Sequence, residues 1–442
     1  MLVAPLLHLQ ALVVLALAIG GGGVAYGLHN LAIQLAALAL LAVHAGRLVA
    51  FVEQAPRLLL ALLLLSLAFP LLQIIPLPPT IWQELPGRAP VVESHALAGI
   101  DPATWAPLSL DPARSLVAFL GMFAPAAIIA IGSTLASEER ARLALTMAAA
   151  AFAAMLLGTV QLASVNSTAM IYPISPAPDV LYATFANRNS TGLLFVLSLI
   201  LLAALPLAQR RLWLLARGVA ATLLAFGVVL TQSRSAMVLL VPAGAFVLVR
   251  LAFAAWQRRV GRALHPAPIS PQTFMAGVAL AGVLAAILGV SALSGGRVAE
   301  SLDRFDRLET DRVEMWDDAY FATGNYWPVG SGMGTFDEVF QLHESLEYVS
   351  PRKAGRAHSD WLEIAIEGGI IALLLAGAWL AWVLFSVLRG PAKGDGWLHF
   401  GAGTGLGCIA LQSLLDYPLR NQALLCAAAV LVVLVARQRE PA

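Results

Sequence analysis

Charged residues are scarce in this chain, and their scarcity excludes an ordinary soluble protein. Only 12% of the 442 residues are Asp, Glu, Lys or Arg, whereas 59% are hydrophobic. A soluble globular chain carries about 25% charged residues, and half that density does not cover a water-exposed surface. The sequence also lacks a basic stripe or a run of like charges, and its net charge is +1, which excludes nucleic acid as a partner.

Cysteine is almost absent as well. The two cysteines, Cys408 and Cys426, lie in apolar segments, so we interpret them as packing residues and expect neither a disulfide nor a metal pair. A positively charged leader is also missing, because the first basic residue of the chain is Arg47. We therefore expect the apolar run 5–24 to be a membrane helix and not a cleaved signal peptide.

Long apolar runs make up most of the chain. A helix needs about 20 apolar residues to cross a hydrocarbon layer about 30 Å thick. Backbone polar groups cannot go unbonded in lipid, so the runs predict an all-α polytopic membrane protein with about 12 transmembrane helices. The segments that qualify lie approximately at 5–24, 30–49, 58–75, 115–135, 141–164, 191–207, 212–230, 235–256, 273–293, 361–388, 398–415 and 419–435.

The charges in the connections predict the orientation, because positive residues gather in cytoplasmic connections. With both termini cytoplasmic, only five of the 26 acidic residues fall in the inner connections. The basic residues that fall there are Arg57, Arg140, Arg142, Arg210, Arg211, Arg217, Arg258, Arg259, Arg262, Arg389, Lys393, Arg437 and Arg439. We therefore expect both termini inside and the long connections outside.

The spans and connections predict five regions. A long polar loop on a rigid scaffold is a typical carrier of function, so the largest outer loop is of most interest. The regions are 1–75 with helices 1–3, 76–114 as an outer segment rich in Pro and Trp, 115–293 with helices 4–9, 294–360 as the large, partly helical outer loop between helices 9 and 10, and 361–442 with helices 10–12.

The large outer loop has internal structure of its own. Residues 301–322 have helical periodicity, and we expect an amphipathic helix that lies on the membrane surface. The glycine run 330–334 that follows is expected to be a plain turn, with an anion-binding nest as the alternative. The sequence AHSDWLEIAIEGG then predicts a helix whose N-cap is Ser359 or Asp360.

Ionisable residues are almost absent from the middle depth of the spans and cluster at their outer edge. Transporters of ions or polar solutes usually have ionisable or broken-helix features near the midplane. The pattern therefore favours a site at the outer edge, for a substrate with its head group at the interface and its tail in lipid. The clustered residues are Arg188, Arg234, Arg312, His358, Asp360, Glu363, Glu367, Asp416 and Arg420.

Three arginines are candidate ligand contacts. Arg234 lies in the tight polar turn TQSRSAM, where a guanidinium fork suits a phosphate, and snorkelling to the interface is the alternative. Arg312 precedes Trp316 by four residues on the same helix face, where a solvated arginine is the alternative. Arg188, in FANRNS before the sixth span, is equally consistent with an anchor and with a ligand contact.

His358 is the candidate base, because it immediately precedes the N-cap of the tenth span. The positive end of that helix favours a neutral imidazole, which accepts a proton or orients a hydroxyl. A loop histidine without a task is the alternative. Glu363 and Glu367 share a helix face, and we expect them to hold an arginine in place. The acidic pairs of the loop have no accompanying histidine, so we predict no metal site.

Several of these motifs resemble the O-antigen ligase and O-antigen polymerase (Wzy-type) family. The similarity spans roughly 180–420 and lies in TQSRSAM, DRVEMWDDAYFATGNYWPVGSGMGTF, AHSDWLEIAIEGG, FANRNSTGLL and LLDYPLR. One departure is Ser359, where many relatives have asparagine.

The resemblance implies a GT-C-like glycosyltransferase of the bacterial inner membrane. It would move a glycan, with inversion and without metal or cofactor, from undecaprenyl diphosphate to an acceptor hydroxyl in the periplasm. The resemblance assigns catalytic roles to His358, Arg234 and Arg312. Substrate contacts are expected from Arg188, Trp316, Asp360, Glu363 and Arg420.

The acceptor and the competing functions stay open at this point. The acceptor is a glycolipid in a ligase, a second carrier-linked glycan in a polymerase, or a protein. The segment QIIPLPPTIWQELPGR resembles exopolysaccharide polymerases slightly. The alternatives to an enzyme are a transporter or flippase for a lipid-linked glycan or solute, and a non-catalytic scaffold in an envelope complex.

Overall fold

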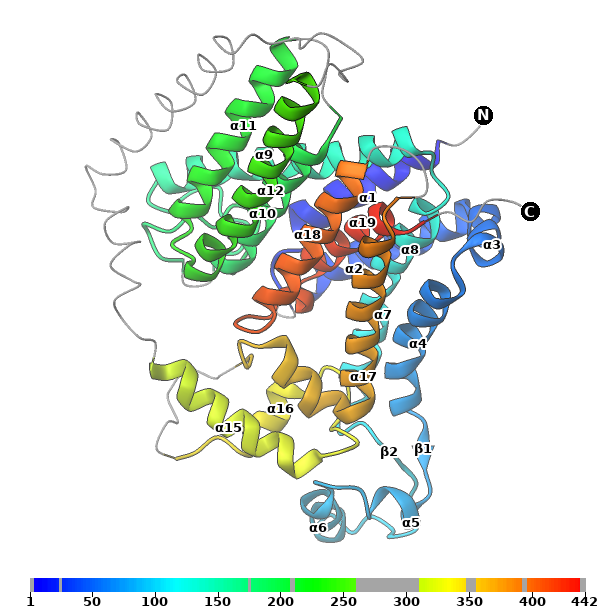
Figure 1. Cartoon of the computed structure of the whole chain (residues 1–442). Helices are drawn as coiled ribbons and strands as arrows, with labels where there is room; N and C mark the ends of the chain where they lie inside the picture. Colours follow the sequence, from blue (N-terminus) through cyan, green and yellow to red (C-terminus); the bar gives the residue numbers. More distant parts are fainter. Residues whose placement is uncertain are drawn as a thin grey trace.

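The structure is a computed structural model that describes residues 4–23, 26–173, 176–206, 211–259, 310–346, 355–391 and 396–437. Nearly every described element is a helix (Figure 1), which confirms the all-α prediction. The helices are α1 (Pro5–Ile19), α2 (Gly27–Val43), α3 (Ala45–Gln54), α4 (Arg57–Gln73), α5 (Pro79–Trp82), α6 (Ala89–Leu97), α7 (Pro112–Gly121), α8 (Phe123–Gly132), α9 (Ser137–Ala163), α10 (Arg188–Ala204), α11 (Arg211–Leu230), α12 (Arg234–Arg259), α15 (Thr310–Tyr326), α16 (Phe336–Phe340), α17 (Asp360–Arg389), α18 (Gly396–Gln412), the 3-10 turn η2 (Pro418–Arg420) and α19 (Gln422–Val435). Strands β1 (Pro76–Leu77) and β2 (Ala106–Pro107) form a short antiparallel ribbon.

The expected spans coincide with these helices, except for 273–293, which lies outside the described residues. In the described part of the chain, five helices are long and apolar enough to cross a membrane, or six if a bent pair counts as one span. Further apolar helices, such as α1 and α19, have fewer than 18 residues. The structure therefore supports a multi-helix membrane protein, while the number twelve stays a prediction.

Two of the expected straight spans are broken. The segment 30–49 is divided at His44, where α2 and α3 meet at an angle of 80°. The segment 361–388 is broken at Gly369, whose φ of 56° and ψ of −147° are not helical. A Cβ at Gly369 would lie 2.0 Å from the carbonyl oxygen of Pro328, so only glycine permits this close approach of the backbones. The break separates the first turns of α17, which carry the carboxylates, from the long apolar helix.

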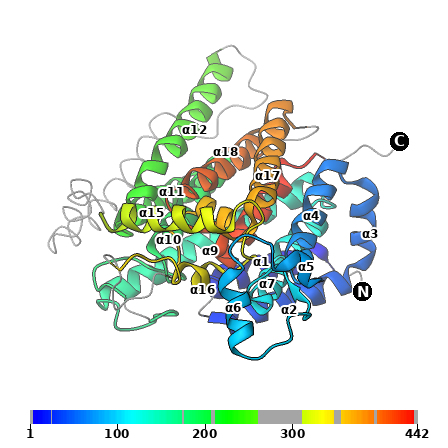
Figure 2. The ribbon, with the colours of Figure 1, turned by 90° about the horizontal axis from the view of Figure 1, so that it is seen from below.

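Helices α15 and α16 and the first turns of α17 form a layer at one end of the bundle, hereafter the α15 end (Figure 1). Seen from below, α15 lies across this end, with α5 and α6 beside it (Figure 2). Buried apolar side chains separate from the main core hold the layer together, namely Ala319, Ala322, Tyr326, Phe336, Val339, Phe340, Ala357 and Ile366.

The amphipathic helix expected at 301–322 is present as α15, although residues before 310 lie outside the described part. Its buried face, with Ala319, Ala322 and Tyr326, packs on α16 and α17. The loop thus folds back and supplies apolar partners for this face, which periodicity along one helix does not reveal. The position of α15 on the membrane surface stays a prediction.

Polar N-caps begin several helices at the α15 end. The side chains of Asp111, Asn187, Ser359 and Asn421 accept hydrogen bonds from the first backbone N–H groups of α7, α10, α17 and α19. Each such cap contributes about 1 kcal/mol to helix stability. The N-cap of α17 is Ser359, one of the two residues that the sequence allowed.

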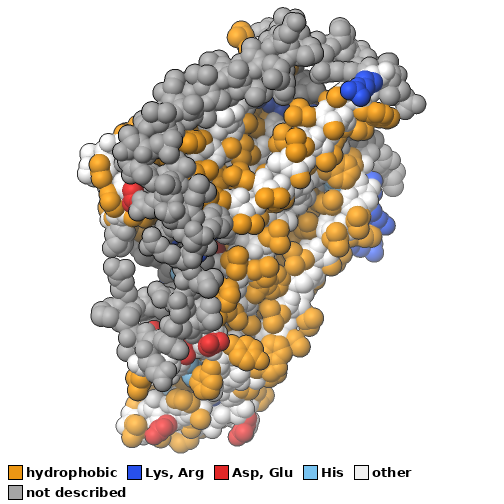
Figure 3. All heavy atoms as spheres, turned by 60° about the vertical axis from the view of Figure 1, so that its left-hand side comes forward, with side chains coloured by type: hydrophobic (Ala, Val, Ile, Leu, Met, Phe, Trp, Pro, Cys, Tyr) orange, Lys and Arg blue, Asp and Glu red, His pale blue; other side chains and the backbone are white. Residues whose placement is uncertain are grey.

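Charge and apolar surface are arranged along the bundle axis. On the face in Figure 3, hydrophobic side chains cover the long helices, Lys and Arg lie toward the upper end, and most Asp and Glu lie toward the lower end. Arg57 and Arg140 lie in the first turns of α4 and α9, and Arg389 ends α17, so all three lie at the end opposite α15. This matches the charge separation expected from the sequence.

The Pro/Trp-rich segment docks against the glycine turn of the large loop. The Arg88 side chain, only 1% exposed, donates to the carbonyl oxygens of Pro86 at 2.9 Å, Gly330 at 3.1 Å and Leu108. Burial lowers the pKa of Arg88 to about 10, so the guanidinium stays charged at neutral pH.

The glycine run itself is a packed turn. Gly330, Gly332 and Gly334 all have positive φ, and the N–H groups of Gly330 and Gly332 donate to the carbonyl oxygens of Tyr326 and Glu367. The N–H of Met333 donates to Gln73 Oε1 at 2.8 Å. These N–H groups are used within the protein, so the turn interpretation fits better than an anion-binding nest.

Candidate active site

His358 lies in the last residues before α17, with a backbone φ of 49°. Its side chain is 35% exposed, and its Nδ1 lies 3.2 Å from Oδ1 of Asp416. The imidazole also contacts the ring of Tyr417 edge-on, with 5.1 Å between the ring centroids. Positive φ is uncommon for a residue other than glycine, and such strain often occurs at functional sites.

Asp416 fixes the orientation of this histidine. The Asp416 side chain is fully buried in the linker between α18 and η2, and its Oδ2 accepts a hydrogen bond from the Asn187 amide at 3.2 Å. Since a carboxylate only accepts, Nδ1 of His358 carries the proton, and Nε2 is left as the basic nitrogen. In Ser-His-Asp triads, a buried carboxylate holds the histidine base in one tautomer through the same hydrogen bond to Nδ1.

The sequence pattern did not assign this role to Asp416. The residue was counted among the ionisable residues at the outer edge but had no partner. The sequence signal for this role was the aspartate in the motif LLDYPLR. Only the fold shows that this aspartate contacts a histidine 58 residues away.

A second polar cluster lies beside this pair and is buried. Asp360, Glu363 and Glu367 are each at most 1% exposed, and Arg420 enters among them. Arg420 Nη1 lies 2.5 Å from Glu367, and its Nε lies 3.3 Å from Glu363 and 3.7 Å from Asp360. Burial alone lowers the pKa of Arg420, but the carboxylates of Glu367, Glu363 and Asp360 together raise it, so this arginine remains charged.

Glu363 also binds a second arginine, because Arg356 Nη1 lies 3.0 Å from its Oε2. The two glutamates therefore hold arginines in place, as their spacing on one helix face predicted. Asp360, Glu363 and Arg420 were expected to contact substrate, but each is buried and paired within the protein. This geometry supports a role in fixing the start of α17 against η2.

Trp316 connects α15 to the segment that carries His358. Its indole Nε1 donates to the carbonyl oxygen of Ala357 at 2.9 Å, directly before the histidine. Arg312 lies one turn earlier in α15, and its side chain is outside the part that the structure describes. The helix that bears Arg312 is thus bound to the histidine segment.

Arg234 begins α12 directly after a buried polar turn. Thr231 and Ser233 are at most 1% exposed, and Ser233 Oγ accepts from the N–H of Ala236 at 3.2 Å. A Cβ at Gly192 would lie 2.4 Å from the Cβ of Ala236, so this turn is pressed against the start of α10. Arg188 is the first residue of α10 and follows Asn187, the residue that binds Asp416.

The candidate residues therefore lie toward one end of the bundle, although they come from different elements. Arg188 and Arg234 begin α10 and α12, His358 precedes α17, and the backbone of Arg312 lies in the first turn of α15. A helix N-terminus carries a partial positive charge that attracts anions. Helix N-termini and arginines at the α15 end would suit a phosphate group.

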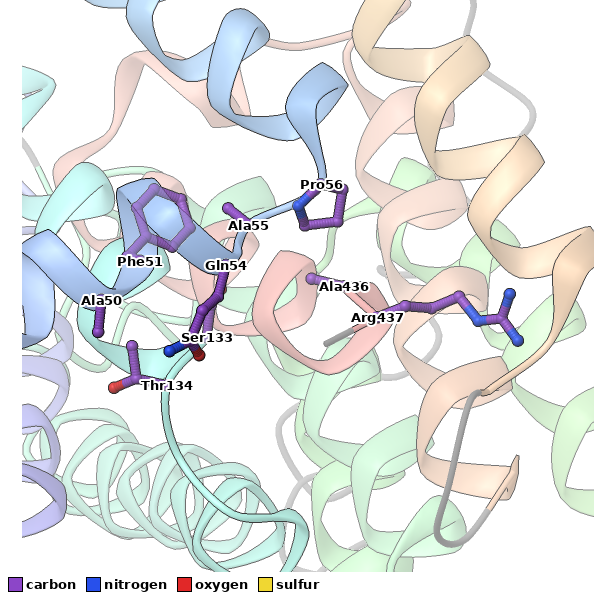
Figure 4. A pocket seen from close by; sticks show the side chains of 9 residues that line it. All are labelled: Ala50, Phe51, Gln54, Ala55, Pro56, Ser133, Thr134, Ala436 and Arg437. Carbon is purple, nitrogen blue, oxygen red and sulfur yellow. The ribbon is translucent and has the colours of Figure 1, made fainter. Parts of the chain in front are cut away.

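A small pocket lies elsewhere and does not belong to this site (Figure 4). It is lined by residues that include Phe51, Pro56, Thr134 and Arg437. The pocket lies where α19 ends, whereas the candidate site lies where α19 begins. Within the described ranges, no group of three His, Cys, Asp or Glu side chains is placed to hold a metal ion.

Comparison with known proteins agrees with the motifs of the sequence. A search among curated proteins found no match. Residues 219–377 match the family model of O-antigen ligase, and this range contains Arg234, Arg312, Trp316 and His358. The matched segment is therefore similar to the corresponding part of O-antigen ligases.

Proposed function

We propose that this protein is an inverting membrane glycosyltransferase that moves a glycan from undecaprenyl diphosphate to an acceptor hydroxyl at the periplasmic face of the bacterial inner membrane. The observation that carries the proposal is the His358–Asp416 pair at the bundle end where Arg234 begins α12. A base held in one tautomer beside a cationic anion site is what this transfer needs.

The donor half of the site consists of Arg234, Arg312 and the nearby helix N-termini. During transfer, the bond between the anomeric carbon and the phosphate oxygen breaks, and negative charge develops on the leaving diphosphate. Guanidinium groups bind phosphate oxygens through two parallel hydrogen bonds and stabilise that charge. The proposal therefore assigns leaving-group stabilisation to these two arginines.

The acceptor half centres on His358. Its Nε2 takes the proton of the acceptor hydroxyl while the acceptor oxygen forms the new bond to the anomeric carbon. The buried carboxylate of Asp416 stabilises the imidazolium that results. A single displacement of this kind inverts the anomeric configuration.

The membrane orientation of the proposal rests on charge. Basic residues begin or end the spans opposite the α15 end, and the positive-inside tendency supports a cytoplasmic location of that end and of both termini. The carrier tail would lie against apolar helices such as α12 and α17, which are only 17% buried over their most apolar windows.

The test uses purified protein in nanodiscs with an undecaprenyl-diphosphate-linked glycan and one acceptor at a time. Arg234→Ala and Arg312→Ala should each lower the rate about 100-fold or more, the typical effect of removing one group that stabilises developing charge. Arg114→Ala is the matched control, because this arginine forms a partly exposed ion pair with Glu338 at the same end. The control should transfer glycan at the normal rate.

The outcomes separate the competing functions. Full transfer by Arg234→Ala would refute the proposal. Movement of the carrier-linked glycan across the bilayer without a new glycosidic bond would favour a transporter or flippase. Product on a glycolipid would favour a ligase, and product on a second carrier-linked glycan would favour a polymerase.

A further inference from the structure

The turn that presents Arg234 contains a strained residue. Gln232 has a backbone φ of 52°, in the left-handed region, and its side chain is 4% exposed. A residue other than glycine or asparagine adopts this conformation at a cost of about 1–3 kcal/mol, so surrounding contacts must hold it there. Gln232 lies two residues before Arg234, and its conformation sets the direction in which the chain enters α12.

Contacts from a distant loop hold Gln232 in this conformation. Its Nε2 donates to the Asp179 carboxylate at 3.1 Å and to the Asp179 carbonyl oxygen at 3.4 Å. Nearby, the N–H of Leu181 donates to the carbonyl oxygen of Leu230 at 3.0 Å. The turn before Arg234 is therefore attached to the loop that connects α9 with α10.

The same loop also reaches the histidine half of the site. It ends at Asn187, whose amide donates to the Asp416 carboxylate that binds His358. Between these points, the Ala183 carbonyl accepts from Gln161 at 3.0 Å and the Tyr182 carbonyl accepts from Thr191 at 2.7 Å. One well-anchored loop segment, residues 179–187, thus contacts both the turn of Arg234 and the acid that orients the histidine.

We propose that Gln232 is a positioning residue, which together with Asp179 fixes the Arg234 guanidinium relative to His358 for binding of the lipid-linked diphosphate. The inference rests on the proposed function and names a support for its donor half. A misplacement of about 1 Å at a reacting centre lowers rates by about 10²-fold. Accurate placement of Arg234 would therefore offset the conformational cost of the strained Gln232 backbone.

The experiment measures donor binding and transfer separately, in nanodiscs. Binding is followed with undecaprenyl diphosphate alone as the probe, and transfer with the carrier-linked glycan. Gln232→Ala should weaken probe binding and raise the donor KM about 10- to 100-fold, with the acceptor KM unchanged. Asp179→Ala should have the same effect, and the double variant should be no worse than either single one, because both lose one shared contact.

Two conservative variants distinguish positioning from stability. Asp179→Asn keeps an acceptor oxygen for Gln232 Nε2 and should retain nearly normal donor binding. Gln232→Gly removes the backbone strain and should keep or raise the melting temperature, yet it should bind the probe as weakly as Gln232→Ala. If Gln232 contributed only to folding, probe affinity would fall only in variants with a lower melting temperature. Gln232→Gly would then bind the probe normally.

Gln10→Ala is the matched control, because the Gln10 amide donates to Thr146 Oγ1 at 2.7 Å near the opposite end of the bundle. It should leave donor binding and donor KM unchanged. If Arg234→Ala weakens probe binding but the Gln232 variants do not, the positioning role is wrong and the proposed function stands. If Arg234→Ala binds the probe normally, the diphosphate site itself is wrong, and both proposals are refuted.

Discussion

The imidazole Nδ1 of His358 and the buried Oδ1 of Asp416 lie 3.2 Å apart, across the junction of α17 with the α18–α19 linker. Asp416 has a second partner in the Asn187 amide, and its carbonyl oxygen accepts from the N–H of Asp360 at 3.1 Å. These contacts fix the position of Asp416, and its carboxylate therefore fixes the orientation of the His358 imidazole.

Replacing Asp416 with asparagine tests whether the carboxylate orients the base. Asp416→Asn keeps the size of the side chain but removes its charge, so the imidazole is no longer held in one tautomer. We expect transfer to slow by about 10²-fold or more, since a positioned base contributes about 10²–10⁴-fold. The measurement is kcat for glycan transfer by folded variant in nanodiscs. A normal kcat would show that this contact is not used in the reaction.

Arg420 should matter for stability more than for substrate contact. Arg420→Ala takes the paired cation away from the buried carboxylates of Glu367 and Asp360, and removing one partner of a buried pair costs about 3–5 kcal/mol. Thermal unfolding in detergent measures this loss. The double variant Arg420→Ala with Glu367→Gln should recover part of it, because one uncompensated charge is gone. A substrate-binding arginine would instead leave the melting temperature unchanged and lose donor binding.

The break in α17 requires glycine. At Gly369, a Cβ would meet the Pro328 carbonyl oxygen at 2.0 Å and the backbone has positive φ, so Gly369→Ala should destabilise the protein by about 3 kcal/mol or more. Gly324→Ala is the matched control, because Gly324 lies inside α15 and a Cβ there has nothing within 4 Å. The control should stabilise the protein by about 1 kcal/mol through helix propensity. Equal melting temperatures for the two variants would show that position 369 does not require glycine.

Stability of the α15 layer should fall in mild acid because of His343. Burial lowers the pKa of His343, whose Nε2 lies 3.1 Å from the Tyr326 hydroxyl. Below about pH 6.5 the unfolded chain binds a proton that the folded layer resists, so the free energy of unfolding decreases as the pH falls through that range. Hydrogen exchange of residues 310–346 at pH 7.5 and pH 5.5 measures the change. His343→Gln should reduce this dependence, and an unchanged slope would exclude the histidine as its source.

Hydropathy alone located the long apolar helices of the described chain, because an apolar run is a local property of consecutive side chains. The apolar runs 58–75 and 141–164 correspond closely to α4 and α9. The motif around Arg234 and the position of His358 before a helix were also readable, since an N-cap and a tight polar turn are short-range features. The Ser359 cap and the arginine-holding glutamates were predicted for the same reason.

Only the tertiary structure decided which side chains meet. From the sequence, Asp416 and Arg420 are two of many ionisable residues near the outer ends of spans. Packing of α17 against the α18–α19 linker makes Asp416 a partner of His358 and Arg420 a partner of three buried carboxylates. The contact of Gln232 with Asp179 depends on how an α9–α10 loop folds over a turn 53 residues away. Periodicity and composition describe residues that are close along the chain. These pairs join residues that are far apart in the sequence, so burial, charge and backbone geometry in the folded protein determine them.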